Sequence, residues 1–224
     1  MLLLAADTSG KHGSIALAQA GPGAFQVIEV VPLVGGTFSA QLVPQIAALL
    51  SKHGFTKQEI GGFVVAAGPG SFTGLRVGLA AIKALAEVLN KPIAAVSLLE
   101  AVAVASGADG KRIAALDAGR GEVYVGEYEV VGGSPKCIQE RILTRESLGQ
   151  ALDDSVLITP DAKVADIARA AGIKVHEIDH PRSDVVARLG WNKILKGETV
   201  SPEELEANYI RRSDAEIFAK PGPK

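Results

Sequence analysis

The feature that most constrains the fold is a pair of similar segments 110 residues apart. Residues 3–7 read Leu-Leu-Ala-Ala-Asp, and residues 113–117 read Ile-Ala-Ala-Leu-Asp. In both places an apolar run ends in aspartate, a short glycine-containing turn follows, and a second β-type run begins, at 14–17 and at 122–125. We interpret the pair as a weak internal duplication, which predicts two similar α/β lobes that face each other. Two unrelated hairpins are the alternative.

Turn residues between β-type and helix-type runs divide the chain into elements. Strands are predicted at 2–7, 14–20, 25–33, 62–67, 93–96, 113–117, 122–125, 127–131, 137–143, 156–159 and 174–178. Helices are predicted at 39–53, 73–89, 98–106, 162–171 and 184–196. A further helix is expected to begin at Ser201, which is followed by proline and two glutamates. The order predicts an N-terminal lobe at 1–106, a smaller C-terminal lobe at 107–200, and a C-terminal helix with a disordered tail at 201–224.

Composition argues against several classes of protein. The 224 residues carry a formal net charge of −2, with 47% hydrophobic and 21% charged residues, which is typical of a globular chain. A near-neutral net charge argues against a protein that binds nucleic acid by itself, because such binding usually requires a strongly basic face. The single cysteine, Cys137, permits no internal disulfide and suits a reducing compartment. Without a long apolar run or the basic start of a signal peptide, we expect a cytoplasmic protein with no membrane attachment.

The most distinctive segment is 68–78, Gly-Pro-Gly-Ser-Phe-Thr-Gly-Leu-Arg-Val-Gly, which joins a predicted strand to a predicted helix. It is not a phosphate-binding P-loop, because no Gly-Lys-Ser/Thr follows, and its glycine spacing differs from the dinucleotide fingerprint. Either Ser71 or Thr73 can cap the helix. For Gly74 and Gly78 we favour the close approach of another element over contact with a ligand.

The two aspartate turns are candidates for a nucleotide pocket. In actin-like ATPases and sugar kinases, a carboxylate at a strand end followed by a hairpin of small residues holds phosphates or a magnesium ion, and the backbone N–H groups of such a turn can cradle an anion. The candidate residues are Asp7, Thr8, Ser9, Asp117, Gly119 and Arg120. The alternative is that each aspartate only caps its own turn. A clear Gly-Gly adenosine loop late in the chain is missing, which argues against a competent ATP site.

Neither a metal site nor a catalytic residue is predicted. The four histidines are His12, His53, His176 and His180, and none forms a pair at helical spacing or a cluster with carboxylates at ligand spacing. A cysteine nucleophile would need a base, and Cys137 is better interpreted as a strand residue. We therefore expect no metal and no resident cofactor.

Two predicted helices are apolar around more of their circumference than a surface helix of a monomer. Only two glutamines are polar between 40 and 50, and only three residues are charged between 73 and 89. Helix-on-helix association with a second subunit explains this pattern, and burial of both helices within the monomer is the alternative. The residues expected at this interface are Leu42, Val43, Ile46, Leu50, Gly74, Arg76, Val77, Gly78 and Ala81.

Three segments of the chain resemble one known family. They are residues 7–9 (Asp-Thr-Ser), the string at 68–78, and residues 116–124, which read Leu-Asp-Ala-Gly-Arg-Gly-Glu-Val-Tyr. Together they resemble the TsaB (YeaZ) family, the dimerisation subunit of the bacterial complex that makes threonylcarbamoyladenosine in tRNA. The resemblance implies the actin-like (ASKHA), ribonuclease-H-like fold: a duplicated α/β architecture of two lobes, each a mixed sheet flanked by helices.

The resemblance further implies a partner role. A subunit of this family is non-catalytic and is required for N6-threonylcarbamoyladenosine formation, because it binds and activates the catalytic paralogue TsaD, together with the ATPase TsaE. It forms a homodimer when alone and leaves tRNA mainly to the complex, and any nucleotide site is vestigial or shared with a partner. The alternatives are a free-standing ATP-dependent enzyme of the actin-like kinase superfamily and, third, a hydrolase. One departure from the family pattern is Ala207, which replaces the proline that often precedes Tyr209 and Arg211.

Overall fold

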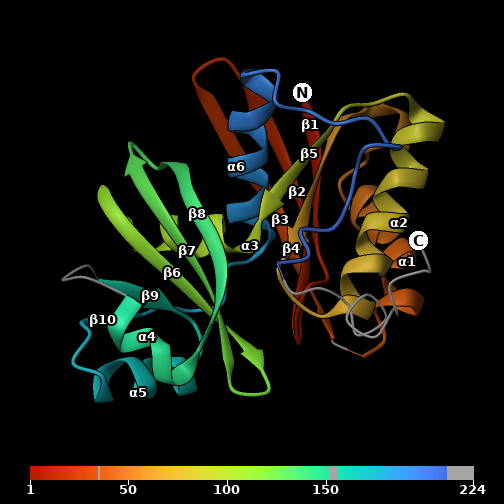
Figure 1. Ribbon diagram of the computed structural model, residues 1–224. Helices are drawn as coiled ribbons and strands as arrows, with labels where there is room; N and C mark the ends of the chain where they lie inside the picture. The colour runs from red at the N-terminus through yellow and green to blue at the C-terminus, as the bar shows by residue number, and fades with distance from the viewer. Residues whose placement is uncertain (35, 152–155, 211–224) are drawn as a thin grey trace, which may run out of the picture.

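The computed structural model describes residues 1–34, 36–151 and 156–210. The described chain contains two five-stranded sheets, ordered β3-β2-β1-β4-β5 and β10-β9-β6-β7-β8 (Figure 1). The first sheet consists of β1 (Leu2–Asp7), β2 (His12–Gly21), β3 (Ala24–Val34), β4 (Ile60–Gly68) and β5 (Ile93–Ser97). The second consists of β6 (Gly110–Gly119), β7 (Glu122–Val131), β8 (Ser134–Thr144), β9 (Leu157–Thr159) and β10 (Val175–Glu177).

Both sheets follow one plan. In each, the first three strands form an antiparallel meander, β1-β2-β3 in one sheet and β6-β7-β8 in the other. The fourth strand then pairs in parallel with the first strand of the meander, and the fifth pairs in parallel with the fourth. The predicted duplication, and with it the two-lobed α/β fold, is confirmed.

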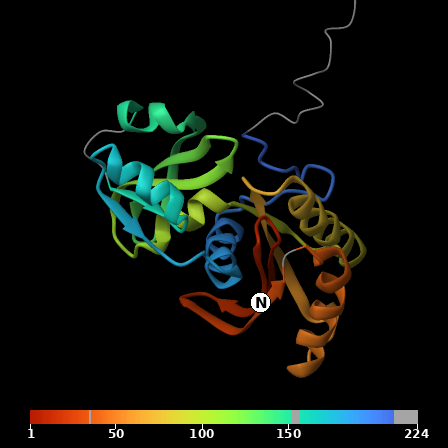
Figure 2. The same cartoon turned by 90° about the horizontal axis from the view of Figure 1, so that it is seen from below.

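The helices cover the sheets in layers (Figures 1 and 2). One face of the first sheet carries α1 (Phe38–Lys52) and α2 (Phe72–Leu89), which share an apolar core with it. Between the sheets lie α3 (Leu98–Ala105) and α6 (Ser183–Leu195), in a core to which both sheets contribute. The second sheet is covered on its other face by α4 (Arg145–Ala151) and α5 (Ala162–Ala170). A short 3-10 helix, η1 (Lys57–Glu59), precedes β4.

Some predicted elements need correction. The runs at 122–125 and 127–131 are one strand, β7, and α4 was not predicted. No helix extends from Ser201, because only one turn closes there, with the Leu205 N–H bonded to the Ser201 carbonyl at 3.1 Å. The Asn208 N–H bonds instead to the carbonyl of Ala67 on β4, at 2.7 Å, which holds the chain against the sheet. The disordered tail predicted at the end of segment 201–224 lies outside the described residues, which end at 210.

The lobes also divide differently from the prediction. By sequence α6 falls in the lobe predicted at 107–200, yet it packs on the first sheet. Gly190 of α6 lies so close to Val64 of β4 that an added Cβ would stand 2.2 Å from Cγ1 of that valine. At the start of α6, the Ser183 N–H donates to Ser14 Oγ at 2.9 Å and the Ser183 hydroxyl donates to the Ser14 carbonyl at 2.7 Å. The chain therefore returns to the first lobe after building the second.

Two glycines of α2 accommodate the turn that follows β1. A Cβ added to Gly74 would stand 2.1 Å from the Thr8 carbonyl oxygen, and one added to Gly78 would stand 2.4 Å from Thr8 Oγ1. The Thr8 hydroxyl donates to the Gly74 carbonyl at 2.7 Å. The expected close approach is confirmed, but the approaching element belongs to the same chain. These glycines are therefore explained by packing within the monomer and not by a second subunit.

We predict that Gly74→Ala destabilises the fold, because the new methyl group overlaps a backbone oxygen that has no rotamer to change. The expected loss is about 1–3 kcal/mol or more in the free energy of unfolding, measured by denaturant titration. Ala80→Gly, at an exposed position of the same helix, serves as the control and is expected to cost about 1 kcal/mol from helix propensity alone. A Gly74→Ala protein as stable as the parent would contradict the packing described here.

Candidate functional site

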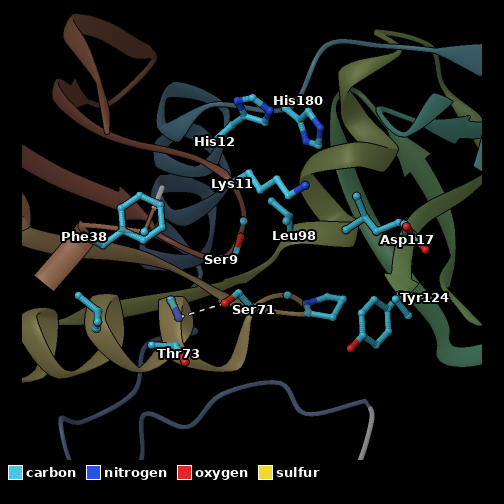
Figure 3. A pocket seen from close by; sticks show the side chains of 18 of the residues that line it. Ser9, Lys11, His12, Phe38, Ser71, Thr73, Leu98, Asp117, Tyr124 and His180 are labelled. Carbon is cyan, nitrogen blue, oxygen red and sulfur yellow. Dashed lines mark hydrogen bonds between the residues drawn. The ribbon is translucent and has the colours of Figure 1, made fainter. Parts of the chain in front are cut away.

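A cavity of about 1040 Å³ lies between the two lobes (Figure 3). On the side of the first lobe it is bounded by the turn after β1, the segment between β3 and α1, and the turn between β4 and α2. On the side of the second lobe it is bounded by the ends of β6 and β7 and the turn after β9. Polar and titratable side chains in its wall include Ser9, Lys11, His12, Asp117, Tyr124, Asp161 and His180.

The six predicted nucleotide-pocket residues are not all at this cavity. Ser9 and Asp117 line it, one from each lobe. Asp7 and Thr8 are buried beneath the turn, where their side chains bond within the protein. Gly119, the last residue of β6, and Arg120, in the turn that follows, are absent from the cavity wall, and both have positive φ angles. The aspartate turns therefore do face one cleft, but through fewer residues than predicted.

The carboxyl group of Asp7 is enclosed by its own turn. Its Oδ1 accepts hydrogen bonds from the Ser9 N–H at 2.8 Å and from the Ser9 hydroxyl at 2.6 Å, and the residue is only 3% exposed. Burial raises the pKa of this carboxyl above its ordinary value, because desolvation outweighs the two bonds from Ser9 and the attraction of His180. Asp7 thus performs the turn-capping role that was the alternative to a ligand contact.

The turn that joins β4 to α2 is tied to the same place. The Ser71 N–H donates to the Ser9 carbonyl at 2.6 Å, and a Cβ added to Gly70 would stand 2.3 Å from that oxygen. The Ser71 hydroxyl, not that of Thr73, caps α2 by accepting from the Gly74 N–H at 3.3 Å. The N-terminus of α2 is therefore fixed at the wall of the cavity.

Asp117 is held from the second lobe. Its Oδ1 accepts from the Gly119 N–H at 3.0 Å and lies 3.4 Å from a guanidinium nitrogen of Arg145 on α4. The N–H of Asp117 donates to Asp161 Oδ2 at 2.8 Å, which connects the end of β6 to the turn after β9. Asp117, like Asp7, has its carboxylate engaged by groups of the same protein.

Sequence reasoning missed the basic and aromatic residues of the cavity. Lys11 and His12 directly follow the first aspartate turn, so their position after Gly10 was a usable signal. His180 carries no such signal, because its neighbours in the sequence form no motif. In the structure its ring lies 5.0 Å from that of His12, centroid to centroid, and its Nε2 lies 3.8 Å from Asp161 Oδ1 (Figure 3). Only the packing of the lobes brings these groups together.

Among the described residues, no group of three or more histidine, cysteine, aspartate or glutamate side chains is arranged to hold a metal ion. Within that same part of the chain, no helix is both long and apolar enough to cross a membrane.

The predicted interface residues separate into two sets. Leu42, Ile46 and Leu50 are 1%, 4% and 5% exposed, because they pack in the core between the helices and the first sheet. With Gly74 and Gly78 they belong to the interior of the monomer, which corrects their assignment to a subunit surface. The remaining four lie outward or at the border of the core: Val43 and Arg76 are exposed, and Val77 and Ala81 are half-buried.

We predict that Asp7→Asn stabilises the protein at neutral pH. Because the pKa of Asp7 is higher in the folded chain, the unfolded chain binds fewer protons between the two pKa values, and stability falls as the pH rises through that window. An asparagine side chain carries no charge whose burial costs free energy, and its Oδ1 can still accept from the N–H and the hydroxyl of Ser9. Unfolding free energies are compared at a pH of about 3.5 and of about 7.5, on either side of the ordinary range of aspartate. The gain of Asp7→Asn over the parent is expected to grow toward the higher pH; a gain that shrinks would contradict the direction of the shift.

Comparison with known proteins shows which family this chain belongs to. Residues 30–156 match the family model described as TsaD, tRNA N6-adenosine threonylcarbamoyltransferase. The chain is 38% identical to the tRNA threonylcarbamoyladenosine biosynthesis protein TsaB of Bacillus subtilis, over 96% of both chains, and 32% identical to that of Haemophilus influenzae, over 94% of both. Its fold is similar to that of YeaZ from Pseudomonas aeruginosa, with a TM-score of 0.77 and 24% identity over 93% of this chain and 99% of that one. The chain therefore belongs to the TsaB (YeaZ) family and has its actin-like, ribonuclease-H-like duplicated fold.

Proposed function

We propose that this protein is a non-catalytic subunit of the machinery that forms N6-threonylcarbamoyladenosine in tRNA. The observation that carries the proposal is the 38% identity over 96% of both chains to the Bacillus subtilis protein named for that biosynthesis. Similarity over nearly the whole length of both chains supports a shared role more strongly than similarity over a single domain would. The subunit acts by binding and activating the catalytic paralogue TsaD, together with the ATPase TsaE, in the cytoplasm.

The cleft supports a role outside the chemistry itself. A kinase-like site needs carboxylates free to hold a metal ion and phosphates. Here the Asp7 carboxyl is buried and bonded to Ser9, and the Asp117 carboxylate is bonded to Gly119 and paired with Arg145. Both groups serve the fold of their own lobes. A near-neutral net charge of −2 likewise favours leaving tRNA mainly to the partners.

The outer faces of α1 and α2 supply a surface for those partners. Val43 and Val88 are 53% and 76% exposed, although both are apolar. Exposed alanines lie on the same two helices, at Ala47, Ala48 and Ala84. Exposed small and apolar residues on two helices that pack side by side are one mark of a protein–protein contact. We assign it to a homodimer when the protein is alone and to the paralogue when that is present, with Val43, Arg76, Val77 and Ala81 as its members.

One observation favours the alternative, an ATP-dependent enzyme of the actin-like kinase class. The interlobe cavity of about 1040 Å³ is large enough for a nucleotide, since ligand pockets usually range from roughly 300 to 1,000 Å³. A nucleotide could bind there without turnover, as in a vestigial or partner-shared site. Activity measurements on the isolated chain separate the two functions.

We predict that the purified chain alone does not hydrolyse Mg-ATP, and that tRNA threonylcarbamoylation by the paralogue and the ATPase depends on adding it. The assay follows the modified adenosine by mass spectrometry, with each component omitted in turn. An isolated chain that turns over ATP, and loses this turnover in Asp117→Ala, would favour the kinase-like alternative. Full tRNA modification without the chain would exclude the proposed role.

We predict that Val43→Glu weakens self-association and binding of the paralogue at least about tenfold, because association would bury an unpaired carboxylate. Light scattering and a pull-down measure the two contacts. Val131→Glu is the matched control, since Val131 is 66% exposed but lies in the second lobe at the β7–β8 turn. Leu42→Glu is expected to unfold the protein, because Leu42 belongs to the core. A folded Val43→Glu variant with unchanged associations would show that the partner surface lies elsewhere.

A further inference from the structure

A second, smaller cavity of about 330 Å³ lies where β8, the end of β5 and the segment 206–208 meet. One carboxylate in its wall, that of Glu140 on β8, accepts three hydrogen bonds from three parts of the chain. Ser97, at the start of α3, donates its hydroxyl to Oε1 at 2.5 Å, and Tyr128 of β7 donates its hydroxyl to the same oxygen. Asn208 donates its Nδ2 to Oε2 at 2.6 Å.

The sequence of the second lobe prepares Glu140 for this role. Gly126 pairs with Glu140 across β7 and β8, and the ring of Tyr128 lies over it: a Cβ at Gly126 would stand 2.6 Å from Tyr128 Cε2. A larger residue would displace the ring, so Gly126 lets Tyr128 reach Glu140 while remaining fully buried. Burial and the nearby Glu140 carboxylate raise the pKa of the Tyr128 hydroxyl, which keeps it a hydrogen-bond donor.

The segment around Asn208 is fixed to the first lobe independently. Its backbone N–H donates to the Ala67 carbonyl at 2.7 Å. Gly68 has a φ of +117°, and a Cβ there would stand 3.1 Å from the Asn208 carbonyl oxygen, so the segment lies directly on the end of β4. On the next residue, the ring of Tyr209 lies 5.2 Å from that of Phe72, at the start of α2.

Two further carboxylates line this cavity, those of Glu100 and Glu206. Glu100 of α3 is paired with Lys193 of α6 at 3.1 Å. It also accepts from the Ser97 N–H at 3.2 Å. Glu140 is thus a carboxylate of the second lobe that bonds to the segment, through the side-chain amide of Asn208.

We propose that the Glu140–Asn208 hydrogen bond is a latch that sets the distance between the two walls of the large cleft. One end of the latch is two residue pairs from Tyr124, which lines the cleft on β7 and pairs with Ile142 of β8. The other end bonds to Ala67, two residues before Pro69, which lines the opposite wall. Opening the latch removes one of the hydrogen bonds, beside that from Ser97, that tie Glu140 of the β7–β8 hairpin to the first lobe, so the cleft widens. The inference does not depend on the proposed function.

The test exchanges the hydrogen-bond donor and the acceptor of the latch between positions 208 and 140. In Asn208→Asp two carboxylates face each other, and the latch is expected to open. In the double variant Glu140→Gln with Asn208→Asp, the glutamine oxygen still accepts from Ser97 and Tyr128 while its Nε2 donates to the carboxylate introduced at position 208, so the latch is expected to close again. Asn90→Asp, which makes the same change at the exposed end of α2, is the control.

Hydrogen exchange followed by mass spectrometry reports the latch. Asn208→Asp is expected to exchange about tenfold or more faster at the amides of 97–99 and 205–210, with the amides of β1 and β2 unchanged, and the double variant is expected to restore the parent rates. Unchanged rates in Asn208→Asp, or acceleration of β1 and β2 to the same degree, overturn the latch. Failure of the double variant to restore the parent rates overturns the pairing with Glu140. If Asn208→Asp does not fold, recovery of folding and of the parent rates in the double variant supports the pairing, and its absence rejects it.

Cleft width is measured separately by spin-label distances between cysteines placed at exposed Lys57 and Lys163, one in each lobe, in a Cys137→Ser background. Excess unlabelled protein removes distances between copies. Asn208→Asp is expected to shift or broaden the distance distribution, and the double variant to return it to that of the parent. A distribution that stays the same while exchange accelerates would show that the bond holds the segment but does not set the cleft.

Discussion

The packing of the turn after β1 against the start of α2 is the contact on which the first lobe and its cleft depend. Thr8 lies against Gly74 and Gly78, and Ser9 lies against Gly70, at distances that leave no room for a side chain. Hydrogen bonds from Thr8 and Ser71 close the same contact. Because backbone meets backbone there, the turn cannot move without moving the helix. This packing gives the glycines of the string at 68–78 a structural role.

A second constraint is the core shared by the two sheets. Residues from α3 and α6 fill the space between them, and α6 reaches the first sheet from the far end of the chain. The lobes are therefore joined by packed helices, and the cleft is what remains open at one side of that junction. A polar network centred on Glu140 joins the hairpin of the second lobe to the end of β4, where the turn into α2 begins.

The two aspartates at the cleft are both bonded within their own turns. Asp7 is the last residue of β1 and Asp117 lies two residues before the end of β6, and each accepts a hydrogen bond from the residue two positions further along. A protein can keep the shape of an actin-like cleft while its carboxylates stabilise local turns. The outer surface of α1 and α2 then becomes the more informative feature, because its exposed valines have no role in the core.

The sequence by itself determined the duplicated plan, most of the strands and helices, the turn at 68–78 and the family. These follow from local patterns: apolar runs, glycine and proline positions, and a repeated strand that ends in aspartate. Only the tertiary structure decided what the side chains in each pattern pack against. Helical spacing could not tell that Leu42 and Ile46 point to the sheet while Val43 points outward, nor that Gly74 meets Thr8 and not a partner. The rings of His180 and His12 lie together, and Asn208 bonds to β4 and does not continue a helix from Ser201. In both cases contacts between residues distant in sequence outweigh local propensity.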